Sequence, residues 1–143
     1  MPYRYIEEIA TSDVAFEAWG GTLEDLFKSA VDATMNLMVE NLETIERKEK
    51  KEIEAEDSSE DLLLFQVLQE MIFIKDAYLL VMRFDEVGIK REDGVLRFRG
   101  RASGEELNRQ KHHLAVDVKA VTMHRLKVEM KDNGWHATVV LDI

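Results

Sequence analysis

A turn signal near the C-terminus constrains the fold of this chain most strongly. Asn133-Gly134 separates two runs of strand-forming residues, 126–130 and 135–143. Because both turn residues tolerate positive φ, the pattern predicts a β-hairpin. The second strand runs to the last residue, and a strand held in a sheet fixes its end in space, whereas most termini fray. The side-chain carboxylate of Asp142 and the α-carboxylate of Ile143 would then lie together at one corner of the sheet.

The composition indicates one globular domain over residues 1–143. The chain is 45% hydrophobic and 34% charged, and it is long enough to bury a core. It has no cysteine, which excludes disulfides and thiolate metal sites and suits a reducing cytoplasm without requiring one. No apolar run is long enough to span a membrane, and no apolar signal core follows Met1. We therefore expect a cytoplasmic protein without a membrane segment.

Hydrophobic periodicity predicts an α+β fold, with two helices packed on a single, mostly antiparallel sheet. The first helix is expected to begin after Thr22 and to stop near Asn41, and the second to begin after Ser58-Ser59, with acidic residues in both first turns. Strands are expected over 3–9, 14–19, 77–90, 95–101, 114–123 and in the terminal hairpin. Part of 42–56 is expected to form an exposed edge strand, and 103–113 to form a loop or a short helix.

The net charge of −10 bears on the partners of the protein. A protein that binds nucleic acid directly needs a basic patch for phosphates, and here acids outnumber bases 29 to 19. Arg97, Arg99 and Arg101 would share one face of a strand and could meet phosphate or an acidic partner. A solvated face flanked by acids is the commoner outcome for such a row. An acidic surface suits a divalent cation or a basic protein partner better than RNA or DNA.

No pattern for a phosphate-binding loop or a catalytic nucleophile is present. His112 and His113 are adjacent in a polar stretch, so on a strand they would point opposite ways. His124 and His136 could face each other across the terminal hairpin, which is more often a cross-strand pair than a metal site.

Three aspartates remain as candidate ligands at the ends of the expected elements: Asp13, Asp117 and Asp142. Carboxylate oxygens suit hard cations such as Ca²⁺ and Mg²⁺. Oxygen ligands have no diagnostic spacing, however, and an aspartate at the position of Asp13 is more often a turn-forming residue than a ligand. The residues alone leave both readings open.

The two ends of the chain carry motifs that resemble the archease family. Residues 118–124 read Val-Lys-Ala-Val-Thr-Met-His, similar to the family's Val-Lys-Ala-(Val/Ile)-Thr-Tyr-His. The sequence ends on Asp142-Ile143, similar to the family's Asp followed by Ile or Val. Residues 11–14 resemble a second hallmark, His-Thr-Ala-Asp-(Val/Ile)-Gly, and 19–27 resemble the start of the family's first helix. The chain departs at Ala10, where the family usually has histidine, and at Met123, where it usually has tyrosine. The missing histidine affects any role of that residue beside a metal, but the aspartate is kept.

The resemblance implies a function. Archeases are accessory factors of the RtcB-type tRNA-splicing ligase, which joins RNA ends through a guanylylated histidine with GTP and divalent metal. The resemblance implies that this protein promotes guanylylation and multiple turnover of the ligase, is not itself an enzyme, and meets RNA only through the ligase.

The resemblance also implies the site residues. A divalent cation, Ca²⁺ or Mg²⁺ with Mn²⁺ as a further candidate, would be bound by Asp13, Asp142 and the C-terminal carboxylate of Ile143, and Lys119 would be required for function. The alternative is a chaperone-like modulator of DNA- or RNA-processing proteins with a structural metal. A stand-alone metal-dependent hydrolase is disfavoured, because no positioned histidine base or dense carboxylate cluster is present.

Overall fold

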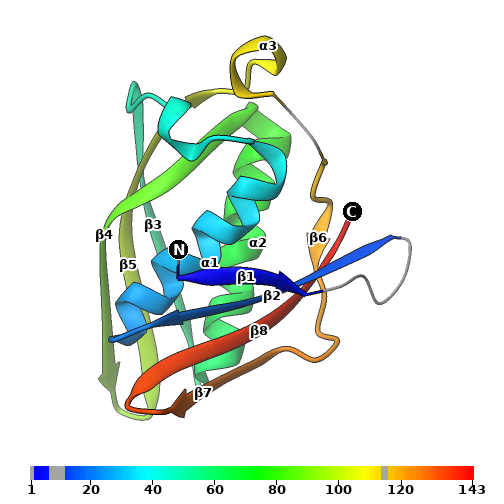
Figure 1. Cartoon of the computed structure of the whole chain (residues 1–143). Coiled ribbons are helices and arrows are strands. Elements are labelled where there is room, and N and C mark those ends of the chain that lie inside the picture. Colours follow the sequence, from blue (N-terminus) through cyan, green and yellow to red (C-terminus); the bar gives the residue numbers. More distant parts are fainter. Residues whose placement is uncertain (1, 7–11, 114–115) are drawn as a thin grey trace.

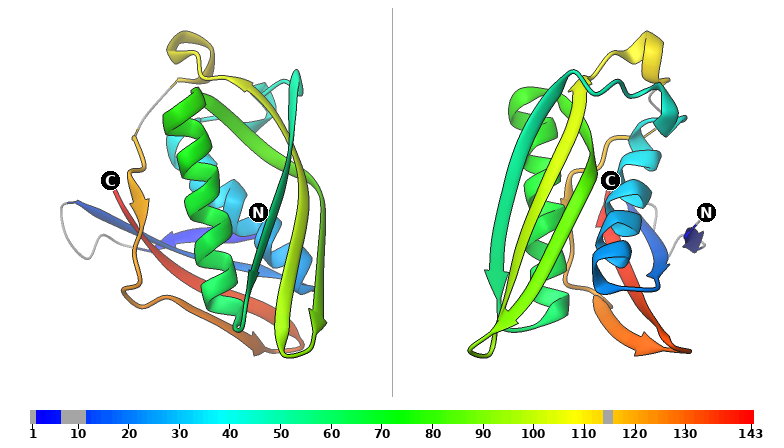
Figure 2. Two further views of the ribbon diagram at one scale, coloured as in Figure 1. Left: turned by 180° about the vertical axis from the view of Figure 1, so that it is seen from behind. Right: turned by 90° about the vertical axis from the view of Figure 1, so that its left-hand side faces the viewer.

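The computed structural model describes residues 2–6, 12–113 and 116–143, and it shows an α+β fold in which two long helices lie between two antiparallel sheets (Figure 1). Both helices contact strands of both sheets. The α+β prediction with antiparallel strands is confirmed, but the strands divide into two sheets where one was expected. Figure 2 shows the helices between the sheets in the edge-on view.

The larger sheet has five strands in the order β1-β2-β8-β6, and β7 also pairs with β8. Its strands are β1 (Tyr3–Ile6), β2 (Asp13–Gly20), β6 (Ala120–Val121), β7 (Lys127–Lys131) and β8 (Gly134–Asp142). The smaller sheet has the order β3-β5-β4, with β3 (Glu49–Asp57), β4 (Leu80–Glu92) and β5 (Val95–Glu106). The last strand of the chain is therefore an inner strand of the larger sheet.

Helices α1 (Leu23–Met38) and α2 (Glu60–Tyr78) begin where the capping residues predict. The Thr22 hydroxyl accepts from the Asp25 amide at 3.1 Å, and the Ser59 hydroxyl accepts from the Leu62 amide at 3.4 Å. α1 ends at Met38, before the predicted stop, because Asn41 instead caps a short 3₁₀ helix (Leu42–Thr44). The core between the sheets is formed by the buried faces of both helices and the facing strands, including the stacked rings of Phe27 and Phe98.

The terminal hairpin is confirmed, with a shift of one residue in its turn. Lys131 pairs with Gly134, so the two central residues are Asp132 and Asn133, with φ of 52° and 63°. Asp and Asn are the non-glycine residues that best tolerate this left-handed conformation. His136 lies opposite Glu129 in this hairpin, so the predicted pairing of His136 with His124 is wrong.

Two further predicted strand boundaries are wrong. Ala77 and Tyr78 are helical, because α2 continues until Leu79 adopts a left-handed conformation (φ 56°) with no glycine to signal it. The polar stretch after Ser103 was expected to leave the sheet, but β5 continues to Glu106 because its polar side chains have partners. A short helix, α3 (Arg109–His112), follows.

The predicted strands at 3–9 and 114–123 are shorter where the structure describes them. β1 ends at Ile6, and 7–9 lie outside the described residues. Within 116–123, only Ala120–Val121 is a strand, and 114–115 lie outside the described residues. No helix in the described ranges is long and apolar enough to cross a membrane.

Candidate metal centre at the C-terminal corner

The pairing of β2 with β8 places Asp13 directly opposite Asp142. Residues directly opposite each other in an antiparallel pair project from the same face of the sheet, so the two carboxylates share one face. The next pair in the register is Val14 with Leu141, and the Leu141 side chain is fully buried in the core. The aspartates therefore lie at the last pair of a ladder that the core holds in place.

The last residue is held beside this pair. The amide of Ile143 donates to the carbonyl oxygen of Ser12 at 2.9 Å, which continues the β2–β8 ladder past Asp142. Figures 1 and 2 show the chain end next to β6. We use the term C-terminal corner for Asp13, Asp142 and Ile143. Within the described ranges no three His, Cys, Asp or Glu side chains are grouped to hold a metal ion, and the corner has two such side chains plus a main-chain terminus.

The charges of the C-terminal corner fit a hard cation. Like charges directly opposite each other on a sheet are destabilising. Among the described residues, neither Asp13 nor Asp142 forms a salt bridge that would offset the repulsion. Both aspartates are half-buried, so water screens them less than it would on an open surface. Oxygen donors of this kind suit Ca²⁺, Mg²⁺ or Mn²⁺.

Lys119 lies beside Asp142 on the side away from Asp13. Its amide donates to the carbonyl oxygen of Asp142 at 2.8 Å, and the next residue, Ala120, pairs with Asp142 in β6. The prediction that Lys119 lies within a strand and shares a face with Asp117 is wrong, because β6 begins at Ala120. Lys119 is exposed, while Val118 and Val121 on either side of it are buried in the core.

Two residues that the sequence analysis missed hold this segment from α2. Lys75 Nζ donates to Asp117 Oδ1 at 2.6 Å and to the Val118 carbonyl at 2.8 Å, and the Val121 amide donates to Gln69 Oε1 at 2.6 Å. The available signal was that Lys75 shares a helix face with the apolar residues Met71 and Ile72, since lysine is almost never fully buried unless paired. Nothing in the sequence indicated its partner 42 residues away.

The third predicted aspartate, Asp117, is therefore an ion-pair partner of Lys75 and is not brought to the C-terminal corner by any described contact. His112 is likewise committed elsewhere. Its Nδ1 accepts from the Asn108 amide at 2.9 Å and its Nε2 lies 3.0 Å from Glu105 Oε2, with both side chains buried. His113 is exposed at the end of α3, so the two adjacent histidines do not form one site.

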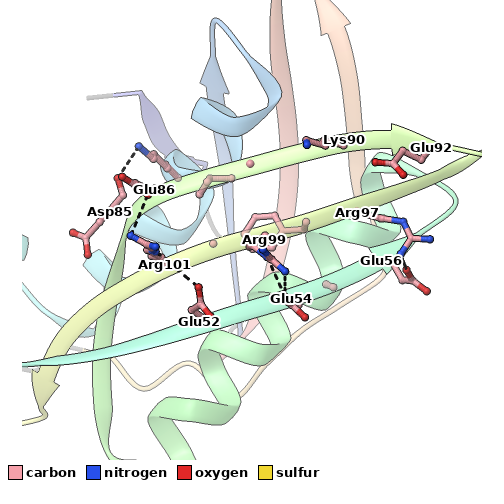
Figure 3. A pocket seen from close by; sticks show the side chains of 16 residues that line it. Glu52, Glu54, Glu56, Asp85, Glu86, Lys90, Glu92, Arg97, Arg99 and Arg101 are labelled. Atoms are coloured by element: carbon pink, nitrogen blue, oxygen red, sulfur yellow. Dashed lines mark hydrogen bonds and ion pairs between the residues drawn. The ribbon is translucent and has the colours of Figure 1, made fainter.

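The row of Arg97, Arg99 and Arg101 is flanked by acids on the outer face of the smaller sheet (Figure 3). The arginines on β5 face glutamates on β3: Arg97–Glu56 at 3.0 Å, Arg99–Glu54 at 2.7 Å and Arg101–Glu52 at 3.9 Å. Arg101 also lies 3.7 Å from Glu86 on β4. The groove over these strands is thus lined by paired charges, which favours the solvated-face interpretation over phosphate binding.

Comparison with known proteins agrees with the sequence motifs. Residues 3–143 match the model of the Archease protein family (MTH1598/TM1083). The chain is 38% identical to a protein archease of Methanopyrus kandleri, over all of both chains, and 34% identical to one of Pyrococcus abyssi, over 93% of this chain and 94% of the relative.

Solved structures show the same fold. The solution structure of protein 1598 of Methanobacterium thermoautotrophicum is 31% identical and superposes with a TM-score of 0.85, covering 99% of both chains. A crystal structure from Thermotoga maritima, described as "an archease, possible chaperone", superposes with a TM-score of 0.61 at 22% identity, covering 96% of this chain and 97% of that one. At that identity the second likeness concerns the fold alone.

Proposed function

Because the chain belongs to the archease family, we propose that it is a metal-binding accessory factor of an RtcB-type RNA ligase. In this role it promotes guanylylation of the ligase and its multiple turnover, without ligating RNA itself. Its net charge of −10 supports contact with the ligase rather than with RNA.

The observation that carries the proposal is the register of β2 and β8, which sets Asp13 opposite Asp142. Two carboxylates and a nearby chain terminus supply the oxygen donors that a hard cation needs, and a bound cation would offset their repulsion. When bound, the cation supplies a fixed positive charge that attracts phosphate oxygens. Lys119 is exposed next to Asp142, where its ammonium would add a second positive charge for an anionic group presented by the ligase.

The decisive experiment is multiple-turnover ligation by the cognate ligase, with and without this protein. We expect the protein to raise the number of turnovers that the ligase completes. An Asp13→Ala, Asp142→Ala double variant should fail to raise it. A Glu52→Ala, Glu54→Ala double variant is the matched control, since it removes two carboxylates from the β3 face. Equal turnover with and without the wild-type protein would overturn the proposal.

A chaperone-like role is the second candidate, because the acidic surface of the protein also suits contact with a basic protein partner. In that case the metal would be structural, and the protein would protect a partner from aggregation without changing its turnover. A light-scattering assay of the heated ligase, run beside the ligation assay, separates the two. Protection that survives the loss of both aspartates, together with unchanged turnover, would favour the chaperone-like role.

A further inference from the structure

The segment 117–121 has little main-chain structure of its own. Only Ala120 and Val121 pair in a strand, and the segment joins β8 at an edge of the larger sheet. It nevertheless carries Lys119, whose amide donates to Asp142. Figure 2 shows this segment running between α2 and the end of β8. The position of the segment therefore depends on its hydrogen bonds with side chains of α2.

Helix α2 contacts the segment near both of its ends. At one end, the Lys75 side chain is only 3% exposed. Its ammonium uses its three N–H donors on Asp117, on the Val118 carbonyl and on Asp76 at 2.5 Å. At the other end, Gln69 Oε1 accepts from the Val121 amide. Gln69 and Lys75 both belong to α2, six residues apart, so a single helix contacts the segment at both of its ends.

The ion pair is asymmetric. Lys75 is buried, whereas the side chain of Asp117 is 68% exposed. Burial alone would lower the pKa of Lys75, but its hydrogen bonds to Asp117 and Asp76 outweigh burial and raise that pKa above the ordinary lysine value. An apolar side chain at position 75 would remove a buried charge from the helix, and the Asp117 carboxylate, which is already largely exposed, would then be solvated by water. The contact therefore joins a buried side chain of α2 to an exposed aspartate of the segment, and it also satisfies the buried Val118 carbonyl.

We propose that Lys75 and Gln69 are positioning residues that clamp the segment 117–121 and thereby hold Lys119 beside Asp142, one of the proposed cation ligands. The inference rests on the proposed function for the role of the C-terminal corner. Neither residue touches the corner directly in the contacts described here. They act through the main chain between them, in the way that outer contacts orient metal ligands elsewhere.

Lys75→Met is the main test, because methionine has a similar length and remains a good helix former. We expect the variant to fold with a lower thermal midpoint, because the buried Val118 carbonyl loses its donor. Exchange of the Lys119 and Thr122 amides should be at least about tenfold faster in the metal-free protein. Both amides donate to β8 carbonyls and neither touches a side chain of α2, so they report on the segment itself. Calcium affinity, measured by calorimetry, should fall about 10- to 100-fold.

Asp76→Asn is the matched control. Asp76 contacts the same ammonium but belongs to α2, so its loss should leave the exchange rates and the calcium affinity at wild-type values. A second pair of variants tests the other end of the clamp. Gln69→Met removes the acceptor for the Val121 amide and should reproduce the effects of Lys75→Met, whereas Gln69→Glu keeps an acceptor oxygen and should retain affinity. This pair decides the question if Lys75→Met does not fold.

The outcomes separate the clamp from the proposed function. Unchanged exchange in both Lys75→Met and Gln69→Met would overturn the clamp, whatever the metal data show. Faster exchange with wild-type calcium affinity would overturn its link to the site. If the wild-type protein bound no calcium, magnesium or manganese, the proposed metal centre itself would fail and the clamp would lose its role there. The exchange data would still report whether α2 holds the segment.

Discussion

Lys119 is tied to Asp142 by its main chain, through the hydrogen bond from its amide to the Asp142 carbonyl at 2.8 Å, and its side chain is exposed. Replacing the side chain leaves this bond intact. We therefore expect Lys119→Ala to change the free energy of unfolding by less than about 1 kcal/mol. Stimulation of ligase guanylylation should fall strongly, because the ammonium next to the corner is lost. Chemical unfolding and a guanylylation assay check the two effects, and full stimulation by the folded variant would remove Lys119 from the site.

The repulsion between Asp13 and Asp142 predicts a metal-dependent stability. A cation that binds the folded protein at one hundred times its Kd should stabilise it by about 2.7 kcal/mol. In the Asp13→Asn, Asp142→Asn double variant the repulsion is gone and so are the ligands. We expect the metal-free variant to be at least as stable as the wild type and to show no gain with Ca²⁺. Thermal unfolding with and without Ca²⁺ measures both, and an equal calcium shift in the variant would exclude these ligands.

An extension after Ile143 tests the terminal carboxylate. Added residues replace the α-carboxylate by a neutral peptide carbonyl and move the charge away, while the Ile143 amide can still donate to Ser12. The fold should survive, and both calcium affinity and ligase stimulation should drop. The same tag placed at the N-terminus is the control. A C-terminally extended protein with the affinity and activity of the untagged one would show that the carboxylate is not a ligand.

Glu105 gives the fold a defined acid sensitivity. Burial alone would raise its pKa, but hydrogen bonds from Lys111, the Glu46 amide and His112 outweigh burial and hold the pKa at about 2. A carboxylate whose folded pKa is depressed stabilises the fold above its unfolded pKa, near 4.5, and that stabilisation is lost as the pH falls toward 2.

The Glu105→Gln variant measures this contribution. It should cost about 1–3 kcal/mol at pH 7, because the buried donors lose a charged acceptor, and the cost should shrink between pH 4.5 and pH 2. Urea unfolding across this range provides the measurement. Glu54→Gln, at an exposed ion pair with Arg99, should change stability by less than about 1 kcal/mol. A cost at position 105 that did not depend on pH would contradict the assignment.

The features that the sequence predicted correctly depend on local chemistry. Thr22 and Ser59 begin their helices because a hydroxyl reaches an amide three residues ahead. The terminal hairpin forms as predicted, although it turns on Asp132-Asn133, one residue before the predicted Asn133-Gly134. Asp13 and Asp142 could be paired only through the family resemblance, since 129 residues separate them and no local rule sets their register. The structure then supplies that register, while the ligand role itself stays a prediction.

The features that the sequence did not reveal depend on distant partners. By sequence, Ser103 and Glu105 are typical of a loop. In the structure their side chains form hydrogen bonds with Arg47, Lys111 and His112, so the sequence did not predict where β5 ends. Leu79 ends α2 in a conformation that leucine rarely adopts. The clamp by Lys75 and Gln69 spans 42 and 52 residues, which hydrophobic periodicity cannot detect.

The inner position of β8 has a consequence for how the molecule folds. β8 follows the other four strands of its sheet in the chain, yet it pairs with β2 on one edge and with β6 and β7 on the other. The five-stranded sheet therefore cannot assemble before β8 has been synthesised, and the edge of β2 that pairs with β8 must wait for a partner more than 100 residues later in the chain. Contacts of such long range slow folding, because the loop-closure entropy is lost before the pairing forms. The β3-β5-β4 sheet with α2 is complete earlier and is the natural first unit to fold.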